Sequence, residues 1–197
     1  MVKSKFTTQI IAGDFKGKKL DLPDLEVTRS SKSIIKESFF NRLQFDIIDA
    51  NFVEFFGGSG SIGLEALSRG AKKIYFFEKD DRSFKTLKNN IERLDPSRCE
   101  AMKGDVFVNF PSVLSRLKAA NEEVYFYADP PFSIRDGMDD IYDKTVEMIA
   151  SIPANLVALL AIEHMTGLEL PESIGDLRLS KSKKFGKTTL TYYERSE

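Results

Sequence analysis

The segment that decides the fold is NFVEFFGGSGSIGLEALSRGAKKIYFFE, residues 51–78. It begins with an apolar run at residues 51–56 and continues through a glycine-rich turn into an amphipathic stretch that ends at Arg69, before Gly70. A second apolar run follows at residues 73–78. A strand, a tight turn, a helix and a second strand make one βαβ unit. This unit predicts a parallel sheet, because the helical crossover returns the chain in the same direction.

The same alternation continues after residue 78. Helical apolar stripes and extended runs follow in turn at about residues 81–94, 99–103, 106–117, 123–130, 139–151 and 156–163. Two last runs, at about 177–184 and 188–194, have the pattern of terminal strands antiparallel to the others. The fold class is therefore predicted to be α/β, a doubly wound, Rossmann-like sheet with an antiparallel C-terminal strand.

A smaller pair of elements precedes this repeat. Extended runs at residues 6–12 and 18–22 flank a turn with glycines at both ends, which predicts a β-hairpin. The apolar stripe after them predicts a helix that ends near residue 44. We expect a basic hairpin-and-helix extension at residues 1–50 and the main domain at residues 51–197.

Composition limits the classes of protein that fit. The chain has 197 residues, of which 42% are hydrophobic and 16 are Phe, enough apolar surface for one packed domain. The single cysteine, Cys99, cannot form an internal disulfide, and a single histidine, His164, leaves metal chemistry without its commonest ligand. Neither a signal sequence nor a long apolar span is present, so a soluble, cytoplasmic protein without metal or membrane contact is expected.

Charge is distributed unevenly along the chain. The formal net charge is -1, but residues 1–36 carry +4, residues 37–176 carry -9 and residues 177–193 carry +5. Two basic segments around an acidic body are a feature of proteins with a polyanionic partner, but on charge alone an ordinary solvated surface fits equally well. The second segment includes a cluster of lysines, namely Lys181, Lys183, Lys184 and Lys187.

Ligands of doubly wound sheets bind at the carboxyl ends of the strands, and the first informative turn lies there. Gly58, Gly60 and Gly63 fit the pattern GxGxxG directly between a strand and a helix. Glycines allow a tight turn and let backbone N–H groups approach a ligand. The pattern is shared by nicotinamide, flavin and S-adenosylmethionine folds, and so it does not choose between these cofactors.

Two acidic residues accompany this turn. Glu78 ends the next strand, 20 residues after Gly58, where a carboxylate can accept hydrogen bonds from the two hydroxyl groups of a ribose. Glu54 lies within an apolar strand, where an ionised carboxylate requires donors or a cation. A sulfonium group or the N–H groups of the turn would both satisfy Glu54.

The strongest motif is Asp129-Pro130-Pro131-Phe132, directly after a buried strand. A residue that precedes proline is held in an extended conformation, so the Asp129 carboxylate and the Pro130 carbonyl acquire fixed directions. Two fixed acceptors suit an amino group with two N–H bonds and can polarise it toward an electrophilic methyl group. Phe132 would stack on a nucleobase turned out of its helix.

These motifs together resemble a known family. The segments VEFFGGSGSIGLEALSRGA, FFEKD, KGDVF and DPPF resemble the amino-methylating S-adenosylmethionine-dependent methyltransferases. With IIAGDFKGKKL, TRSSKSIIKESFFNRL and KTTLTYYER, the chain looks like the bacterial 16S rRNA guanine-N2 methyltransferases of the RsmD type, from about Gln9 to Arg195. It departs from their usual pattern at Glu54, at Gly57 and at Ser30-Ser31.

The resemblance implies an enzyme that methylates the exocyclic N2 of a guanine in 16S rRNA, within a partly or fully assembled small subunit. It implies S-adenosylmethionine as cofactor. From the composition we expect neither a metal nor a membrane contact, and we expect a monomer. The residues implied for the cofactor are Glu54, Gly58, Ser59, Gly60, Glu78 and Asp105. The target guanine would be held by Asp129, Pro130, Pro131 and Phe132, and RNA would be contacted by Lys16, Lys18, Lys19 and Arg29.

Three alternatives remain open from the residues alone. A DNA adenine-N6 methyltransferase shares the same amino-group chemistry and could use the same four residues. A nicotinamide oxidoreductase fits the glycine turn and Glu78, but it leaves Asp129-Pro130-Pro131-Phe132 without a role. A non-catalytic RNA-binding or assembly module would keep the fold without the reaction.

Overall fold

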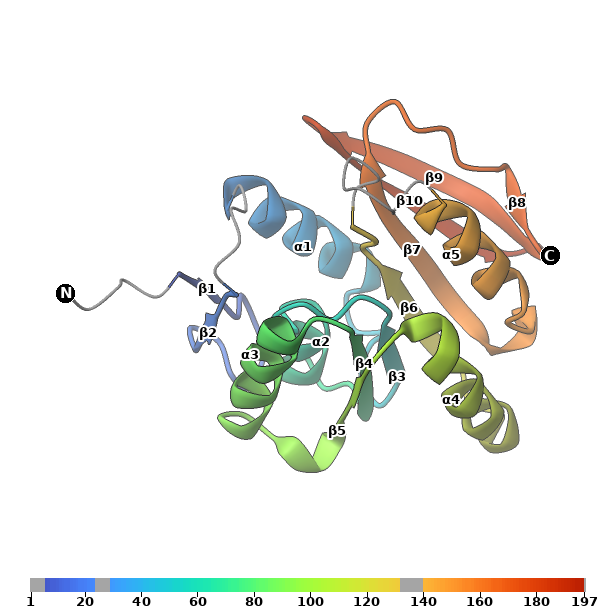
Figure 1. Cartoon of the computed structure of the whole chain (residues 1–197). Coiled ribbons are helices and arrows are strands. Elements are labelled where there is room, and N and C mark those ends of the chain that lie inside the picture. Colours follow the sequence, from blue (N-terminus) through green and yellow to red (C-terminus); the bar gives the residue numbers. More distant parts are fainter. Residues whose placement is uncertain (1–5, 24–28, 132–139, 197) are drawn as a thin grey trace. The chain divides into compact units, whose positions relative to one another are not determined.

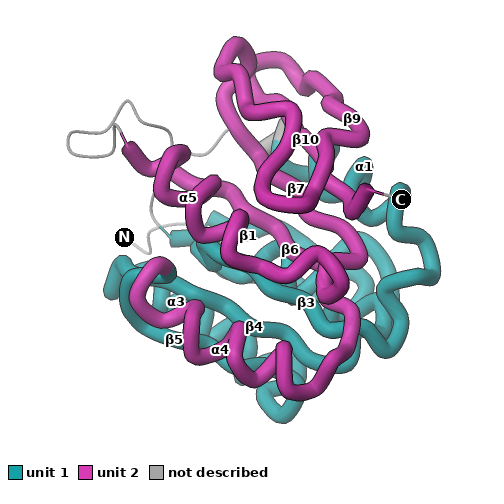
Figure 2. The backbone as a smooth tube through the Cα atoms, turned by 90° about the vertical axis from the view of Figure 1, so that its right-hand side faces the viewer, with its two compact units in different colours: residues 1–106 teal, residues 107–197 magenta. Residues whose placement is uncertain are grey.

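The computed structural model describes residues 6–23, 29–131 and 140–196 (Figure 1). The chain divides into two structural units, residues 1–106 and residues 107–197 (Figure 2). In the first unit, two short strands form the hairpin, and a helix leads into alternating strands and helices. These elements are β1 Thr7–Gln9, β2 Lys19–Asp21, α1 Arg29–Leu43, β3 Asn51–Glu54, α2 Gly63–Ser68, β4 Lys73–Glu78, α3 Asp81–Glu92, η1 Pro96–Arg98 and β5 Cys99–Lys103.

The three longer strands of the first unit are parallel, in the order β5-β4-β3. Glu54 pairs with Phe76, and Glu78 pairs with Lys103, so the carboxyl ends of all three strands lie at one edge. The hairpin is antiparallel, with Thr7 opposite Asp21. Both observations confirm what the sequence predicts for this half of the chain.

Helix α3 shows how the local sequence sets an element. Asp80 caps its first turn, because the carboxylate accepts hydrogen bonds from the backbone N–H groups of Arg82 and Ser83. Leu87 and Ile91 lie on one face and are buried. The helix ends at Glu92, slightly before the predicted position, since the Asp95-Pro96 step begins a short 3₁₀ turn.

Helix α1 is held against β3 by aromatic side chains. The Phe39 and Phe40 rings lie 6.1 and 6.4 Å from the ring of Phe52, and all three side chains are fully buried. Burying an aromatic side chain contributes about 2 kcal/mol or more. The buried positions Ile35 and Leu43 continue the stripe that predicts this helix.

The second unit continues the alternation and then reverses direction. Its elements are α4 Val106–Ala120, β6 Val124–Ala128, α5 Ile141–Ala150, η2 Ala154–Leu156, β7 Val157–Met165, β8 Ser173–Ile174, β9 Leu177–Phe185 and β10 Thr188–Arg195. Strand β6 is parallel to β7, whereas β10 is antiparallel to β7 and β9 is antiparallel to β10. The predicted antiparallel C-terminal strand is confirmed. The two-residue strand β8 was not predicted, because it is too short to show a period.

Strand β9 differs from its neighbour in exposure. The residues of β10 from Thr188 to Tyr193 are buried, whereas those of β9 from Arg178 to Lys184 are all exposed. Strand β8 pairs with β9 only at Leu177 and Arg178. Most of β9 is therefore an outer strand whose two faces are both accessible to solvent.

Candidate functional site

The glycine turn between β3 and α2 is a tightly bonded loop. Gly58 and Gly60 have φ of 52° and 77°, values that favour glycine. The Gly60 N–H donates to the Gly57 carbonyl at 2.6 Å, and the Gly57 N–H donates to the Phe77 carbonyl at 2.7 Å. A Cβ at Gly60 would lie 2.5 Å from Leu87, whereas a Cβ at Gly58 would meet nothing within 4 Å. The loop therefore packs onto α3 at Gly60 and faces open space at Gly58.

Glu78 contacts the loop at the Gly58 backbone. Its Oε2 accepts a hydrogen bond from the Gly58 N–H at 2.7 Å, and its Oε1 accepts one from the Asp80 N–H at 2.7 Å. Burial raises the pKa of Glu78 above its ordinary value, while hydrogen bonds from backbone N–H groups, those of Asp80 and Gly58 foremost, oppose that shift. A carboxylate has about four acceptor positions, so Glu78 keeps capacity for two further hydroxyl donors.

Glu54 accepts a hydrogen bond from the glycine turn. The side chain is 4% exposed, and its Oε2 accepts a hydrogen bond from the Gly63 N–H at 2.8 Å, at the start of α2. The sequence suggests either a sulfonium group or an N–H group of the turn as the partner of this carboxylate, and the structure contains the contact with the turn. Gly63 itself is needed for packing, because a Cβ there would lie 2.4 Å from the ring of Phe76.

Ser59 and Asp105 complete the residues expected to hold a cofactor in the first unit. Ser59 is 7% exposed, and its carbonyl accepts a hydrogen bond from the side chain of Asn90 at 2.9 Å. Asp105 follows β5 and forms an ion pair with Lys79, with 3.0 Å between Oδ2 and Nζ. The loop after β5 is tied to β4, since the Gly104 N–H donates to the Glu78 carbonyl at 2.9 Å. Three consecutive strand ends thus bring polar groups to one edge of the sheet.

The Asp129-Pro130-Pro131 segment follows β6 in the second unit. Pro130 is buried, and Asp129 and Pro131 are half-buried. Phe132, the last residue of the motif, lies outside the described residues. The segment thus begins at the carboxyl end of a strand whose final three residues are all buried, as the sequence predicts.

A cluster of polar groups near Asp129 was not anticipated from the sequence. The Tyr127 hydroxyl donates to Glu163 Oε2 at 2.8 Å, and both side chains are buried. The Tyr142 hydroxyl is buried without a hydrogen-bond partner in the described part of the chain. Burial raises the pKa of Tyr142, and the charges of Asp129 and Glu163 raise it further. The signal in the sequence was a glutamate inside the apolar run of β7, similar to Glu54 in β3.

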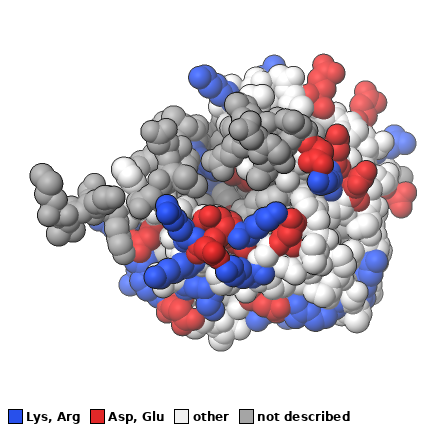
Figure 3. Space-filling model, viewed as in Figure 1, with Lys and Arg blue, Asp and Glu red and all other residues white. Residues whose placement is uncertain are grey.

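The basic residues of the hairpin are accessible. Lys16, Lys18 and Lys19 are all exposed at the hairpin turn and at the start of β2. Figure 3 shows Lys and Arg side chains next to acidic ones over the left half of the face in view, rather than separated by sign. Arg29 begins α1, and its side chain lies outside the described residues.

A buried carboxylate attaches the hairpin to α2. Glu65 is 0% exposed and accepts hydrogen bonds from the Ile11 N–H at 2.8 Å and the Ala12 N–H at 3.0 Å. Its charge is balanced by Arg69 at 2.9 Å and by Lys36 at 3.4 Å. Because a buried charge must be paired, these contacts make the hairpin part of the packing of α2.

His164 and Cys99 occupy structural positions. His164 is 4% exposed, and its Nε2 lies 2.9 Å from the Thr191 hydroxyl. Burial raises the pKa of the Cys99 thiol to about 12, which makes it a poor nucleophile. Within residues 6–23, 29–131 and 140–196, no group of three or more His, Cys, Asp or Glu side chains could hold a metal ion, and no helix is apolar and long enough to cross a bilayer.

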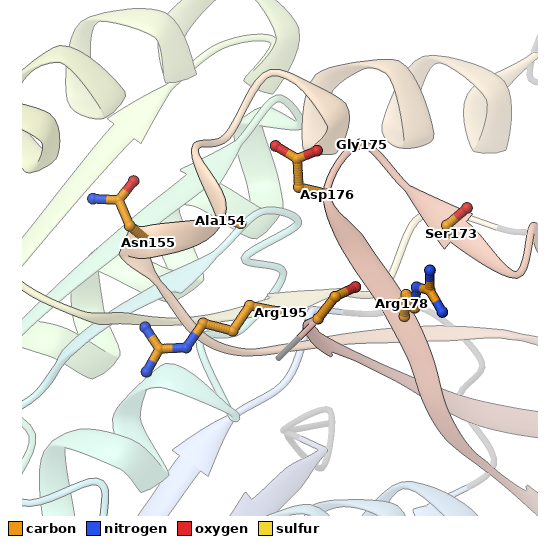
Figure 4. A pocket seen from close by; sticks show the side chains of 8 residues that line it. Ala154, Asn155, Ser173, Gly175, Asp176, Arg178 and Arg195 are labelled. Atoms are coloured by element: carbon orange, nitrogen blue, oxygen red, sulfur yellow. The ribbon is translucent and has the colours of Figure 1, made fainter.

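A pocket of about 430 Å³ lies at the other end of the second unit (Figure 4). It is lined by Ala154, Asn155, Ser173, Gly175, Asp176, Arg178, Arg195 and Ser196. The guanidinium groups of Arg178 and Arg195 point to opposite sides in Figure 4, so they do not converge on one anion. None of the residues predicted for the cofactor, the target base or RNA lines this pocket.

Comparisons with known proteins agree with this arrangement. The Escherichia coli (strain K12) protein named Ribosomal RNA small subunit methyltransferase D is 29% identical over 188 residues, 95% of this chain and 89% of its own. The solved structure of yhhF from Escherichia coli has a TM-score of 0.73 and 26% identity, over 97% of this chain and 99% of that one.

A more distant structure shares the fold. The SAM-dependent methyltransferase from Agrobacterium tumefaciens has a TM-score of 0.67 and 10% identity, over 100% of this chain and 72% of that one. These likenesses confirm the predicted Rossmann-like methyltransferase fold and the resemblance drawn from the motifs. The model of one family matches residues 8–194, and the chain therefore belongs to that family, described as Conserved hypothetical protein 95.

Proposed function

We propose that this protein is an S-adenosylmethionine-dependent methyltransferase that methylates the exocyclic N2 of a guanine in 16S rRNA. The observation that carries the proposal is the Asp129-Pro130-Pro131 segment at the carboxyl end of buried strand β6. The name of the 29% identical Escherichia coli relative supports a ribosomal RNA substrate.

The residues of the first unit fit S-adenosylmethionine. Gly58 faces open space, and the neighbouring Glu78 carboxylate keeps two acceptor positions suited to the two ribose hydroxyl groups. Asp105 lies one strand further along the same edge, suitably placed to accept from an adenine amino group. Gly60, Ser59 and Glu54 shape the loop, because each is held by the packing or the hydrogen bonds of α2 and α3.

The chemistry at the target amine is assigned to the second unit. S-adenosylmethionine, when bound, supplies an electrophilic methyl group. The Asp129 carboxylate and the Pro130 carbonyl accept the two N–H bonds of the guanine amino group and turn its lone pair out of conjugation with the ring. After transfer, the amine loses its proton to Asp129 or to water. Pro131 keeps the segment extended, and Phe132 stacks on the extruded base.

RNA binding is assigned to the basic extension. Lys16, Lys18 and Lys19 are exposed and can neutralise phosphates, and Arg29 would add a fourth cation. We propose 16S rRNA in a partly or fully assembled small subunit as the partner, with the enzyme acting as a monomer in the cytoplasm. Hairpin lysines that contact only phosphates would position the RNA without reading its sequence.

The decisive experiment is Asp129→Ala. We expect turnover to fall by about 10²-fold or more, with little change in the affinity for S-adenosylhomocysteine, because one preorganised acceptor is lost from the reacting amine. The assay follows tritium transfer to small subunits, with Asp143→Ala, an exposed carboxylate on α5, as the matched control. Near-normal turnover of Asp129→Ala would refute the assignment.

The same assay separates the competing functions. Small subunits, naked rRNA and duplex DNA are offered in parallel, and nuclease digestion with mass spectrometry identifies the methylated base. N2-methylguanine in 16S rRNA supports the proposal, whereas N6-methyladenine in DNA supports the alternative methyltransferase. Absence of transfer to all three substrates, with normal binding to rRNA, would support a non-catalytic module.

A further inference from the structure

Asn90 on α3 is a buried amide with every hydrogen-bonding position used. The side chain is 0% exposed. Its Oδ1 accepts from the Asp21 N–H at 2.9 Å and from Arg93, and its Nδ2 donates to the Asp21 carbonyl and to the Ser59 carbonyl, both at 2.9 Å. These partners fix the orientation of the amide, since a backbone N–H can only donate and a carbonyl can only accept.

The two backbone segments that Asn90 joins are far apart in sequence. Ser59 lies between Gly58 and Gly60 in the turn proposed to hold the cofactor, 31 residues before Asn90. Asp21 ends strand β2, 69 residues before Asn90, in the hairpin that carries the exposed lysines. One side chain therefore contacts both the cofactor loop and the basic hairpin.

The hairpin has a second anchor that does not contact the loop. Glu65 accepts from the backbone N–H groups of Ile11 and Ala12, at the other end of the hairpin. These two hydrogen bonds provide an internal reference. A change at Asn90 removes the contact at Asp21 and leaves the contacts at Ile11 and Ala12 in place.

We propose that Asn90 is a positioning residue that couples the order of the cofactor loop to the order of the basic hairpin. The loop contains two glycines with positive φ, so it loses considerable conformational freedom when it becomes ordered. The hydrogen bond from Asn90 to Ser59 restricts the loop before any ligand arrives, and preorganisation of this kind strengthens binding. The ligands of the two segments are taken from the proposed function, on which this part of the inference rests.

Amide hydrogen exchange on the ligand-free protein tests the coupling directly. In Asn90→Ala we expect the amide of Asp21 and those of residues 57–60 to exchange about tenfold faster, the effect of losing about one buried hydrogen bond. The amides of Ile11 and Ala12 keep their wild-type rates. The matched control is Ile91→Val, a mild change at the adjacent buried position of the same helix.

A second variant removes only the donations from Asn90. Asn90→Asp keeps the acceptor for the Asp21 N–H but loses the hydrogen bonds to the Ser59 carbonyl and to the Asp21 carbonyl. We expect faster exchange in residues 57–60 with the Asp21 amide still protected. This isosteric variant also keeps the test available if Asn90→Ala does not fold.

Calorimetric titration with S-adenosylhomocysteine gives the functional readout. We expect both Asn90 variants to bind about tenfold more weakly than the wild type and Ile91→Val to bind within about twofold of it. Bound S-adenosylhomocysteine should slow exchange at Asp21 in the wild type but not in Asn90→Ala. Exchange in the Asn90 variants equal to that of Ile91→Val would overturn the inference, whereas a wild type that does not bind S-adenosylhomocysteine would overturn the proposed function and leave the exchange result standing.

Discussion

At the scale of single residues, Glu78 combines two environments that oppose each other. Removal from water favours its protonated form, while the N–H groups of Gly58 and Asp80 favour the carboxylate. Only the carboxylate accepts hydrogen bonds at all four of its positions. The proposed hydrogen bonds to a ribose therefore require ionised Glu78, and burial raises the pH below which Glu78 is protonated.

We expect cofactor binding to weaken as the pH falls through the raised pKa of Glu78, which lies above the ordinary value of 4.5. The direction follows because burial raises this pKa, so the acceptor is lost at a higher pH than for an exposed glutamate. Titration with S-adenosylhomocysteine between about pH 4.5 and 8 measures it. Glu78→Gln should remove this pH dependence and weaken binding about tenfold at pH 8.

The control for Glu78 is Glu92→Gln, an exposed glutamate at the end of α3. It should show the wild-type affinity and the wild-type pH profile. Binding by the wild-type protein that stays constant down to pH 4.5 would contradict a role for the Glu78 carboxylate.

Residue contacts were predictable from the sequence only where a spacing rule applied. The strand pattern places Gly58 and Glu78 at the carboxyl ends of neighbouring strands, and a direct hydrogen bond joins them. The ribose contact expected from their 20-residue spacing stays a prediction. No such rule points to Asn90, which in sequence is one polar residue in a helix with many. Its partners lie 31 and 69 residues away, so only tertiary packing identifies it.

At the scale of elements, β9 is an exposed strand without acidic residues. Exposed lysines on an edge strand discourage pairing with other chains, and they also suit the phosphates of RNA. Lys183 additionally lies over the ring of Phe185, with its Nζ 5.1 Å from the ring centre. Binding to RNA phosphates weakens strongly as the salt concentration rises, so the salt dependence of RNA binding distinguishes that role from the protection of the strand edge.

We expect replacement of three β9 lysines by alanine to weaken binding to rRNA and to lower its salt dependence. The variant is Lys181→Ala, Lys183→Ala and Lys184→Ala combined. Each phosphate contact contributes a slope of about 0.7–0.9 in log K against log salt, so the slope should fall by about 2 to 3. Filter binding to a 16S rRNA fragment between about 50 and 200 mM salt measures it.

A matched triple variant on the acidic body serves as control for the β9 lysines. It replaces three exposed lysines, namely Lys72, Lys85 and Lys118. Equal salt slopes for both triple variants would mean that β9 lysines only protect the sheet edge. Aggregation of the β9 variant with an unchanged slope would lead to the same conclusion.

Element types were predicted well because most elements are long enough to show a period. The strands at residues 73–78 and 99–103 have the bounds expected from the sequence. Glycine obscures the start of α2, which begins at Gly63 inside the motif itself. Glycine is needed at position 63 because the helix start packs closely on the Phe76 ring of β4. This requirement depends on how α2 packs on β4, and so it cannot be seen in the sequence.

At the scale of the whole molecule, the single histidine offers a direct test of acid stability. His164 Nδ1 lies 3.1 Å from the Met165 carbonyl, which requires a proton on Nδ1, so Nε2 accepts from the Thr191 hydroxyl in the neutral ring. The same Thr191 oxygen lies 2.8 Å from Ser182 Oγ, which joins β7, β10 and β9. Protonation of His164 would remove the Nε2 acceptor, and with it the hydrogen bond from the Thr191 hydroxyl that connects β7 to β10.

We expect the free energy of unfolding to fall as the pH drops below about 6.5, the ordinary histidine value. Burial lowers the pKa of His164 in the folded protein, so the unfolded chain binds more protons in this range and stability rises with pH. Urea unfolding at pH 7.5 and 5.5 measures the difference. His164→Gln should cost about 1 kcal/mol at pH 7.5 and should show a smaller difference between the two pH values.

The pH effect is assigned to His164 by comparison with Asp143→Ala, which keeps the histidine and should show the wild-type difference. If the free energy of unfolding changes between pH 7.5 and 5.5 as much in His164→Gln as in the wild type, the acid sensitivity comes from carboxylates and not from His164.

The sequence shows how charge is distributed along the chain, but it does not show which charged side chains are exposed. The two basic segments indicate a polyanion, and the exposed lysines of the hairpin and of β9 agree with that prediction. What composition cannot show is that Glu65 and Lys36 are internal, where they hold the hairpin rather than face solvent. Charge counts treat every ionised side chain as equal, whereas burial decides which of them a partner can reach.

The attachment of the hairpin to Glu65 also affects the order in which the chain can fold during its synthesis. The amide of Ile11 leaves the ribosome 54 residues before the carboxylate that accepts its hydrogen bond. At a translation rate of about 5–20 residues per second, that interval is about 3–11 s. The hydrogen bonds that attach the hairpin to α2 therefore cannot form until α2 has been made, and until then the nascent hairpin lacks this anchor.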